Sequence, residues 1–306
     1  MPAIDLTKLT SPIRLAGDAH CGFRDPAAYY HDGVFYLYYS YPTIDADGVW
    51  YSQVAWSKSR DLLTWSAPLP FTPRDRMLNY GSPGCVVREG DDFVLCLQTY
   101  PTPGITDKYA DDTARIWTMR SQNLEHWGAP ELLRVKGPDV PIEHMGRMID
   151  AYLLRDRDEP NKWWCFYKQN GVSLSWSYDL RIWNYVGSAQ AGENACVIPD
   201  GGEYVLFSSP ETGILVQRST NLQDWRTCDL LTLGVEHWPW AQGRLSAGFV
   251  LDLRDDPRVG KALLFFHGSR YGEEDPRGGY ANWVSIGLAW SADLKNWEWP
   301  KDCSEC

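Results

Sequence analysis

One seven-residue pattern, Ser-x-Asp/Asn-Leu-x-x-Trp, occurs five times along this chain of 306 residues. Its copies span residues 59–65, 121–127, 177–183, 219–225 and 291–297. The tryptophans of successive copies are separated by 62, 56, 42 and 72 residues. A pattern repeated at this spacing indicates a fold built from five equivalent units of supersecondary structure.

Each copy of the pattern follows a short run of alternating apolar and polar residues, such as 53–57, 116–120 or 287–291. Serine, aspartate and asparagine side chains hydrogen-bond to nearby backbone groups and thereby favour turns. We therefore interpret the five copies as structural turns that pack their leucine and tryptophan onto a sheet. We do not interpret them as functional sites.

Upstream of each copy lies a second run rich in aromatic and β-branched residues. These runs span residues 34–39, 93–97, 163–167, 204–207 and 262–266. Each unit thus holds three or four short antiparallel strands within roughly 40–70 residues, the size of a propeller blade. Helical periodicity is almost absent. The sequence therefore predicts an all-β chain, a five-bladed β-propeller that forms one domain over residues 1–306.

Composition restricts the classes of partner. The net charge of −11 argues against a nucleic-acid or anionic-membrane surface, which requires a basic patch. No apolar run approaches the roughly 18 residues of a membrane span. The first 15 residues show no signal peptide, so we expect a cytoplasmic protein, or a secreted one if a leader was removed. Oligomeric state is not indicated.

The eight cysteines are expected to be thiols. Cys96, Cys165 and Cys196 lie within apolar strand-like runs, where cysteine behaves as a small hydrophobe. Cys303 and Cys306 have C-x-x-C spacing, but a single pair at a chain end is a weak metal or redox signal. The 16 tryptophans exceed what a core of this size needs and fit a protein that stacks sugars.

The first strand of each unit should lie closest to the propeller axis. Three of these five segments carry a carboxylate beside an apolar run: Asp25, Asp150 and Glu193. Asp25 precedes Tyr36 by 11 residues, Glu193 precedes Tyr204 by 11 and Asp150 precedes Trp164 by 14, so we expect all three carboxylates at equivalent positions of the repeat. Glycoside cleavage needs one protonated and one ionised carboxyl group across the scissile bond. Clustering three carboxylates should raise the pKa of at least one of them.

With these residues the chain resembles glycoside hydrolase family 43 and related five-bladed hydrolases: Asp-Pro in the first blade, Ile149-Asp150 in the third, and Glu193 opening the fourth. The resemblance implies that Asp25 is the general base, Asp150 the residue that tunes pKa, and Glu193 the general acid. The chain departs from the family pattern in the second blade. Many members have Ala-Pro-Asp there, whereas this chain has Ser82-Pro83-Gly84. That departure leaves the substrate and the family number open.

The resemblance implies an exo-acting, inverting enzyme of polysaccharide degradation that releases arabinose, xylose or a related sugar from oligosaccharides or glycosides. Inversion requires the carboxyl groups of Asp25 and Glu193 to lie about 6.5–9.5 Å apart. One alternative is a related hydrolase acting on galactosyl or anhydro-galactosyl units. Another is a carbohydrate-binding propeller without catalysis. A fructan-cleaving propeller is disfavoured, because only 23 residues precede Arg24 and leave no room for an earlier blade.

Secondary candidates for substrate binding follow from position in the repeat. Arg244 could fork two sugar hydroxyls, since a guanidinium presents rigid paired donors, and Trp238 and Trp240 could form an aromatic wall. Other candidates lie near the pocket rim or the axis: Phe23, Arg24, Gln98, His144 and His267. No required cofactor is expected; the resemblance allows a calcium ion on the axis near His267.

Overall fold

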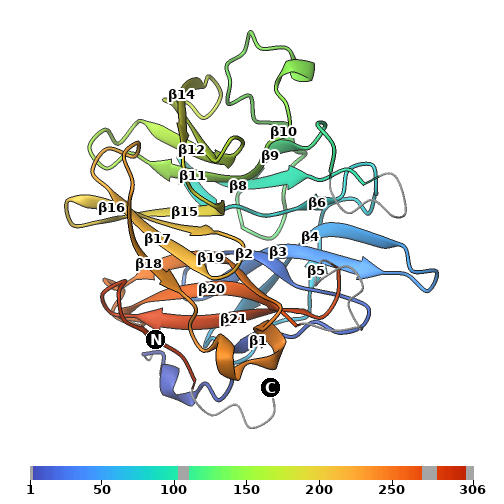
Figure 1. The fold of residues 1–306 in the computed structure, drawn as a ribbon, viewed down its shortest axis with the longest axis vertical. Helices are drawn as coiled ribbons and strands as arrows, with labels where there is room; N and C mark the ends of the chain where they lie inside the picture. Colours follow the sequence, from blue (N-terminus) through green and yellow to red (C-terminus); the bar gives the residue numbers. More distant parts are fainter. Residues whose placement is uncertain (1–2, 103–109, 271–280, 301–306) are drawn as a thin grey trace.

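The computed structural model describes residues 3–102, 110–270 and 281–300. Five antiparallel sheets surround a common axis and form a five-bladed β-propeller (Figure 1), as the repeat predicts. Helical structure in the described residues is confined to four short 3-10 turns: η1 (Leu6–Lys8), η2 (Ile142–His144), η3 (Val235–His237) and η4 (Pro239–Ala241).

The blades follow one another along the chain. Blade one contains β2 (Arg24–His31), β3 (Val34–Ile44), β4 (Trp50–Ser59) and β5 (Leu69–Pro70). Blade two contains β6 (Tyr80–Gly81), β7 (Val86–Glu89), β8 (Asp92–Thr99), β9 (Arg115–Ser121) and β10 (Glu131–Leu132). Blade three contains β11 (Ile149–Arg155), β12 (Trp163–Lys168), β13 (Val172–Ser177) and β14 (Asn184–Ala189). Blade four contains β15 (Glu193–Asp200), β16 (Glu203–Ser209), β17 (Ile214–Ser219) and β18 (Arg226–Leu231). Blade five contains β19 (Arg244–Leu253), β20 (Lys261–Ser269), β21 (Val284–Ser291), β22 (Trp297–Glu298) and β1 (Ile13–Leu15).

The first strands contact one another in a closed ring. β2 contacts β7, β7 contacts β11, β11 contacts β15, β15 contacts β19, and β19 contacts β2. One hydrophobic cluster includes residues from all five sheets and fills the space between the blades. The predicted second strands are confirmed, as are the first strands of blades one, three, four and five. In blade two the predicted first strand is interrupted over residues 82–85 and divided between β6 and β7. The first strands converge where the sequence places the carboxylates.

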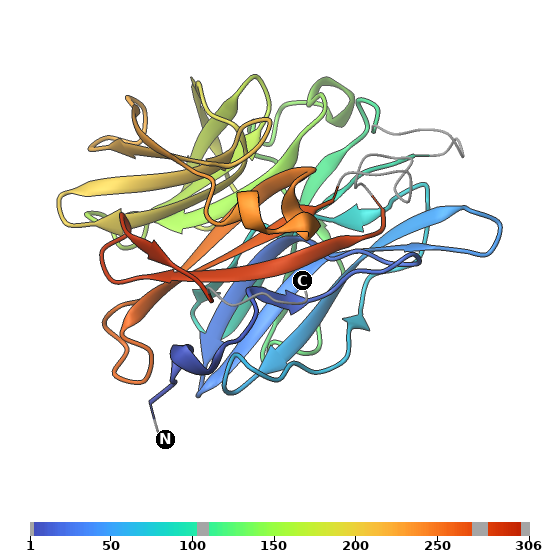
Figure 2. The same cartoon turned by 60° about the horizontal axis from the view of Figure 1, so that its bottom comes forward.

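Blade five is completed by the start of the chain. β1 pairs antiparallel with β21, with Ile13 opposite Gly287 and Leu15 opposite Ile286, while β22 pairs with the other end of β21 (Figure 2). Backbone hydrogen bonds therefore join the first and last segments of the ring. The repeat does not reveal this closure, because β1 is only three residues long and shows no alternation.

The repeated motif forms the same turn in every blade. In blade one, Asp61 Oδ1 accepts hydrogen bonds from the N–H groups of Leu63 and Thr64, at 2.9 Å each, and Ser59 Oγ accepts from Leu62 N–H at 2.9 Å. The motif leucine is buried in a left-handed conformation in all five copies: Leu62, Leu124, Leu180, Leu222 and Leu294, with φ between 57° and 66°. The structural interpretation of the motif is confirmed.

The described cysteines carry free thiols, as expected: Cys21, Cys85, Cys96, Cys165, Cys196 and Cys228. Cys303 and Cys306 lie outside the described residues. Among the residues that the structure covers, none of the helical turns has the length and apolarity to cross a bilayer.

The left-handed leucines make a stability prediction. Leu62→Ala should lower the free energy of unfolding by about 2–5 kcal/mol, because Leu62 is fully buried. Leu62→Gly should lower the free energy of unfolding by no more than Leu62→Ala does. Glycine relieves the strain of a positive φ, which is about 1–2 kcal/mol. Urea denaturation measures both variants. The matched control is Leu95, a buried strand residue, where glycine should be worse than alanine. The same order at both sites would contradict the prediction.

Candidate active site

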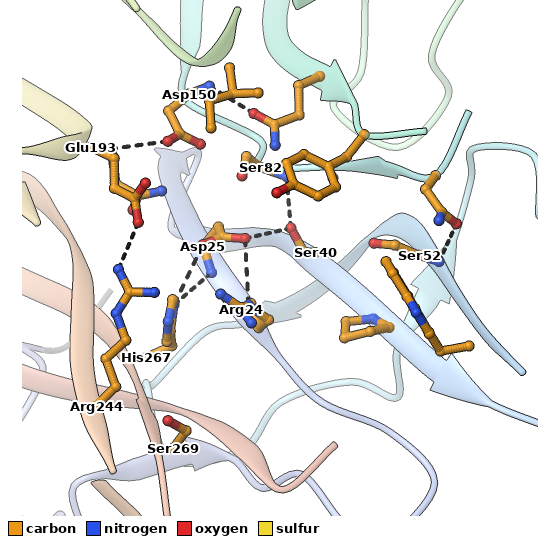
Figure 3. A pocket seen from close by; sticks show the side chains of 18 of the residues that line it. Arg24, Asp25, Ser40, Ser52, Ser82, Asp150, Glu193, Arg244, His267 and Ser269 are labelled. Carbon is orange, nitrogen blue, oxygen red and sulfur yellow. Dashed lines mark hydrogen bonds and ion pairs between the residues drawn. The ribbon is translucent and has the colours of Figure 1, made fainter. Parts of the chain in front are cut away.

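A pocket opens at the propeller axis, where the first strands begin (Figure 3). The cavity has a volume of about 220 Å³, which is somewhat below the roughly 300–1,000 Å³ of typical small-molecule sites. The residues that line it include seven of the predicted site residues: Arg24, Asp25, Gln98, Asp150, Glu193, Arg244 and His267. The structure thus brings the three carboxylates together, from β2, β11 and β15.

The floor of the pocket is shaped by a β-bulge in each blade. In β2, β11, β15 and β19 the pairing with the second strand slips by one residue, whereas in blade two it slips by two residues between β6 and β7. The residue that opens each bulge has a positive φ although it is not glycine: Asp25 (47°), Ser82 (38°), Asp150 (55°), Asn194 (53°) and Ala247 (54°). Bulges redirect side chains and frequently occur beside active sites.

The bulges correct the expected equivalence of Asp25 and Glu193. Asp25 and Asp150 do occupy the same bulge position, but in blade four that position belongs to Asn194, and Glu193 precedes it. The equal spacing to Tyr36 and Tyr204 arises by compensation. Glu193 lies one residue farther from its turn than Asp25 does, and Tyr204 lies one residue closer to that turn than Tyr36 does.

The backbone N–H of each bulge residue is hydrogen-bonded by the preceding blade. Four bonds use a side chain from the second strand of that blade: Asp25 N–H to His267 Nδ1 (3.1 Å), Ser82 N–H to Ser40 Oγ (2.7 Å), Asp150 N–H to Gln98 Oε1 (2.7 Å) and Ala247 N–H to Ser209 Oγ (2.7 Å). Each of these acceptors belongs to a second-strand residue. In its own blade, that residue pairs with the first-strand residue immediately before the bulge. We call these bonds the axial ring.

The axial ring changes between blades three and four. Lys168 occupies the acceptor position of blade three, opposite Ile149, and a lysine ammonium cannot accept a hydrogen bond. Instead the Asn194 N–H donates to Asp150 Oδ2 at 3.4 Å. The Asp150 carboxyl therefore substitutes for the missing acceptor and is directed toward blade four, the blade that carries Glu193.

The Asp25 carboxylate has the Ser40 hydroxyl and the Arg24 guanidinium beside one of its oxygens. Ser40 Oγ donates to Asp25 Oδ2 at 2.8 Å, and Arg24 Nε lies 4.0 Å from the same oxygen. His267 Nδ1 is 3.6 Å from Asp25 Oδ1, but this contact is not an ion pair. Burial, and then the charges of Arg24 and Arg244, hold the pKa of His267 well below its usual range. His267 is therefore neutral, with its proton on Nε2, because Nδ1 accepts the Asp25 N–H.

Asp150 is the most deeply buried of the three carboxyls, with 5% of its surface exposed. Burial, followed by the charges of Glu193 and Asp25, raises its pKa to about 7. A hydrogen bond from Ser82 and the Asn194 N–H oppose this rise. The cluster therefore holds a proton up to about neutral pH, as the sequence predicts for at least one of its members.

Glu193 is paired with Arg244. The distance from Arg244 Nη2 to Glu193 Oε1 is 2.6 Å, and Arg244 Nε donates to the Glu211 carbonyl at 3.1 Å. These two bonds use Nε and one N–H of Nη2, so the predicted fork for two sugar hydroxyls would use the remaining N–H groups of Arg244. Both Glu193 and Arg244 nevertheless line the pocket and remain accessible to a ligand.

Trp238 and Trp240 do not line the pocket, which corrects the expected aromatic wall. They are 2% and 7% exposed and stack on each other and on Phe266, with ring centroids 5.5–5.9 Å apart. Trp240 fits there because Gly268 and Gly287 have no Cβ; an added one would lie 2.5 and 2.8 Å from its indole carbons. The turn η4 thus packs against β20 and β21, and η3 packs against η4.

Phe23 and His144 also lie outside the residues that line the pocket. Phe23 is buried with its ring edge-on to Tyr39, at a centroid distance of 5.2 Å. His144 is exposed and ends the turn η2. Their expected positions at the rim are corrected, because Phe23 points into the apolar core and His144 lies on a surface turn.

The donors around His267 do not fit a calcium ion held by side chains. Calcium takes about six to eight oxygen ligands, whereas His267 offers a nitrogen that already accepts the Asp25 N–H. In the described part of the chain, no group of three or more His, Cys, Asp or Glu side chains is placed to hold a metal. We derive no chemical step through such an ion.

The structure adds pocket residues that the sequence reasoning missed, among them Ser40, Asn79, Tyr100, Arg147 and Ser269. Ser40 could have been found. In each second strand, the residue at the acceptor position is the polar residue that ends an apolar run. The runs are FYLYYS, FVLCLQ, WWCFYK, YVLFSS and ALLFFH, which end at Ser40, Gln98, Lys168, Ser209 and His267. The polar end of each run is the signal. Arg147 lies in a connecting segment, where no repeat marks it.

Comparison with known proteins gives structural likeness only. No family model matches the sequence, and no curated protein matches it significantly. A family 117 glycoside hydrolase from Zobellia galactanivorans, Zg3597, is similar at 14% identity and a TM-score of 0.62, over 91% of this chain and 87% of that one. An exo-1,5-α-L-arabinanase from a bovine ruminal metagenomic library is similar at 14% identity and 0.56, over 89% and 94%. The GH43_1 enzyme from Xanthomonas citri, complexed with xylose, is similar at 13% identity and 0.60, over 92% and 91%. These likenesses show the five-bladed fold of families 43 and 117.

The raised pKa of Asp150 makes a pH prediction. A folded-state pKa of about 7, above the unfolded value, means that the folded protein binds more protons between these two values. The contribution of Asp150 to stability is therefore fully present below the unfolded pKa and is lost as the pH rises through about 7. Asp150→Asn should remove this loss. Urea denaturation at about pH 5 and about pH 8 measures it: the wild type should lose more stability than the variant across this interval. Equal losses would contradict the assigned pKa.

Proposed function

We propose that this protein is an exo-acting, inverting glycoside hydrolase that releases arabinose, xylose or a related sugar from an oligosaccharide or glycoside. The observation that carries the proposal is the placement of three carboxyl groups, from three blades, in one pocket with three different environments. Asp25 has a serine donor and a nearby arginine, Glu193 has an arginine pair, and Asp150 is buried. Such differences separate an acid from a base.

In this proposal Asp25 is the general base. Its carboxylate accepts a proton from a water molecule, whose oxygen attacks the anomeric carbon as the glycosidic bond breaks. Ser40 donates a hydrogen bond to this carboxylate and the Arg24 guanidinium lies beside it, so both groups fix its position. The Asp25 N–H is fixed by His267, so the carboxylate starts from a backbone held by two blades.

Glu193 is the general acid, and it must carry a proton that it gives to the leaving oxygen. In the structure Arg244 Nη2 lies 2.6 Å from Glu193 Oε1, on the carboxyl group that has to reach the leaving oxygen. The proposal therefore requires that a bound sugar draws the guanidinium of Arg244 away from Glu193. Asp150, which stays protonated to about neutral pH, keeps a proton within the same cluster.

The comparisons support the class of substrate. The similar solved structures are glycoside hydrolases, and one of them is complexed with xylose. The pocket also supports exo action, because it is bounded by the inner ends of β2, β11, β15 and β19 and so suits a chain end. A carbohydrate-binding propeller would need hydrogen-bonding groups, but it would not need a protonated acid beside an ionised base.

The roles of acid and base can be separated by leaving group. Glu193→Gln should lose about 10²–10⁴-fold in kcat/KM on glycosides with poor leaving groups. It should lose far less on dinitrophenyl glycosides, because dinitrophenolate departs without being protonated. Asp25→Asn should lose about 10²–10⁴-fold on both, since every substrate needs an activated water.

A matched control for these variants is Glu211→Gln, whose side chain does not line the pocket. It should retain wild-type rates on both substrates. Hydrolysis by Asp25→Asn within about tenfold of wild type, together with no leaving-group dependence for Glu193→Gln, would show that the roles are wrongly assigned. A panel of aryl glycosides that gives no turnover with the wild type would favour the binding-module alternative.

The stereochemical course is tested by NMR of the first product formed. An inverting enzyme releases a sugar whose anomeric configuration is opposite to that of the substrate, because water attacks the face opposite the leaving group. Retention, or a trapped glycosyl adduct on Asp25, would overturn the inverting mechanism.

A further inference from the structure

We propose that the sugar bound in this pocket carries a carboxylate, as a uronic acid does, and that Arg147 binds that carboxylate. The inference rests on the proposed function, because it names the substrate class of the same pocket. It starts from the charges that line the pocket and from the one guanidinium there that has no acidic partner among the described residues.

Three arginines line the pocket, although the chain as a whole has a net charge of −11. Arg24 lies beside Asp25, and Arg244 is paired with Glu193. These two arginines offset the charges of the two carboxylates to which the mechanism assigns base and acid. The third, Arg147, forms no ion pair with any carboxylate in the part of the chain that the structure describes.

Arg147 is held in place by neutral groups. Its backbone carbonyl accepts a hydrogen bond from Gln169 Nε2 at 3.0 Å. Its guanidinium lies over the ring of Tyr100, 5.4 Å from the centroid, and donates to the Tyr100 hydroxyl at 3.3 Å. These contacts leave a partly buried positive charge at the pocket wall, and such a charge is costly without an anion nearby.

The third carboxyl of the pocket does not supply that anion. The charges that act most strongly on the Asp150 carboxyl are those of Glu193 and Asp25. Asp150 is also uncharged below about neutral pH. Under those conditions the pocket holds three guanidinium groups and two carboxylates, so it has an excess positive charge that an anionic ligand would neutralise.

A carboxylate on the sugar fits this excess. A guanidinium binds a carboxylate through two parallel hydrogen bonds, which gives geometric selectivity in addition to charge. Glucuronate is the xylose ring with a carboxylate on C5, and galacturonate has the same relation to arabinopyranose. The inferred ligand is therefore the proposed pentose ring with one added group, placed to reach the wall formed by Arg147 and Tyr100.

The test is calorimetric titration with these matched pairs of sugars in low salt, about 20 mM, where charge effects are least screened. Wild-type protein should bind glucuronate at least tenfold more tightly than xylose, or galacturonate at least tenfold more tightly than arabinose. Arg147→Met should reduce that preference to less than threefold. Arg147→Lys keeps the charge but not the paired donors. Its preference for the uronate should lie between those of the wild type and Arg147→Met.

Arg157→Met is the matched control. Arg157 stacks on Tyr204 at 4.9 Å but does not line the pocket, so this variant removes an arginine–tyrosine contact without touching the site. It should keep the wild-type preference. An equal or weaker affinity for uronates than for pentoses in the wild type would overturn the inference, as would an unchanged preference in Arg147→Met.

Inorganic phosphate is titrated in parallel, because it is a free anion that a basic pocket could also hold. Phosphate binding that depends on Arg147, without any preference for uronates, would overturn the assignment to a sugar carboxylate. The failure of the two proposals can be told apart. Uronate binding without hydrolysis of any glycoside would support the uronate site and reject the proposed glycoside hydrolase. Hydrolysis of pentosides without a uronate preference would support the hydrolase and reject the uronate site.

Discussion

The axial ring of hydrogen bonds is the interaction on which the centre of this propeller depends. Blades of a propeller do not share a sheet, so their backbones are not joined by strand pairing. A buried N–H without a partner costs free energy comparable to a lost hydrogen bond. By satisfying each bulge N–H with a group from the preceding blade, the ring both removes that cost and fixes one blade against the next.

The same ring explains how a repeated backbone can carry a site that is not repeated. Every blade presents one bulge residue to the axis, and the five positions hold different side chains: Asp25, Ser82, Asp150, Asn194 and Ala247. The backbone geometry requires only an N–H at this position. The side chain is therefore free to differ from blade to blade, which lets three blades contribute carboxyl groups while the fold stays fivefold.

Charge is distributed in the pocket by the same elements. Asp25 and Glu193 have arginines beside them, while Asp150 lies deeper, without one, and becomes hard to ionise. In blade three the acceptor position of the axial ring holds Lys168, which cannot accept a hydrogen bond. The Asp150 carboxyl accepts the Asn194 N–H instead and is thereby directed toward blade four. A single acceptor position thus connects the packing of the blades to the protonation of the cluster.

The sequence by itself determined the fivefold repeat, the all-β fold and the three carboxylates near the axis, because turns and strand alternation are encoded by residues close together in the chain. Only the tertiary structure decided which of Glu193 and Asn194 occupies the bulge, since that depends on strand pairing across a turn. It also decided that β1 completes the last blade and that Trp240 fills the core rather than the pocket, seated against two glycines far from it in sequence. Arg147 reached the pocket through a connecting segment, whose path is set by the packing around it and not by any local periodicity.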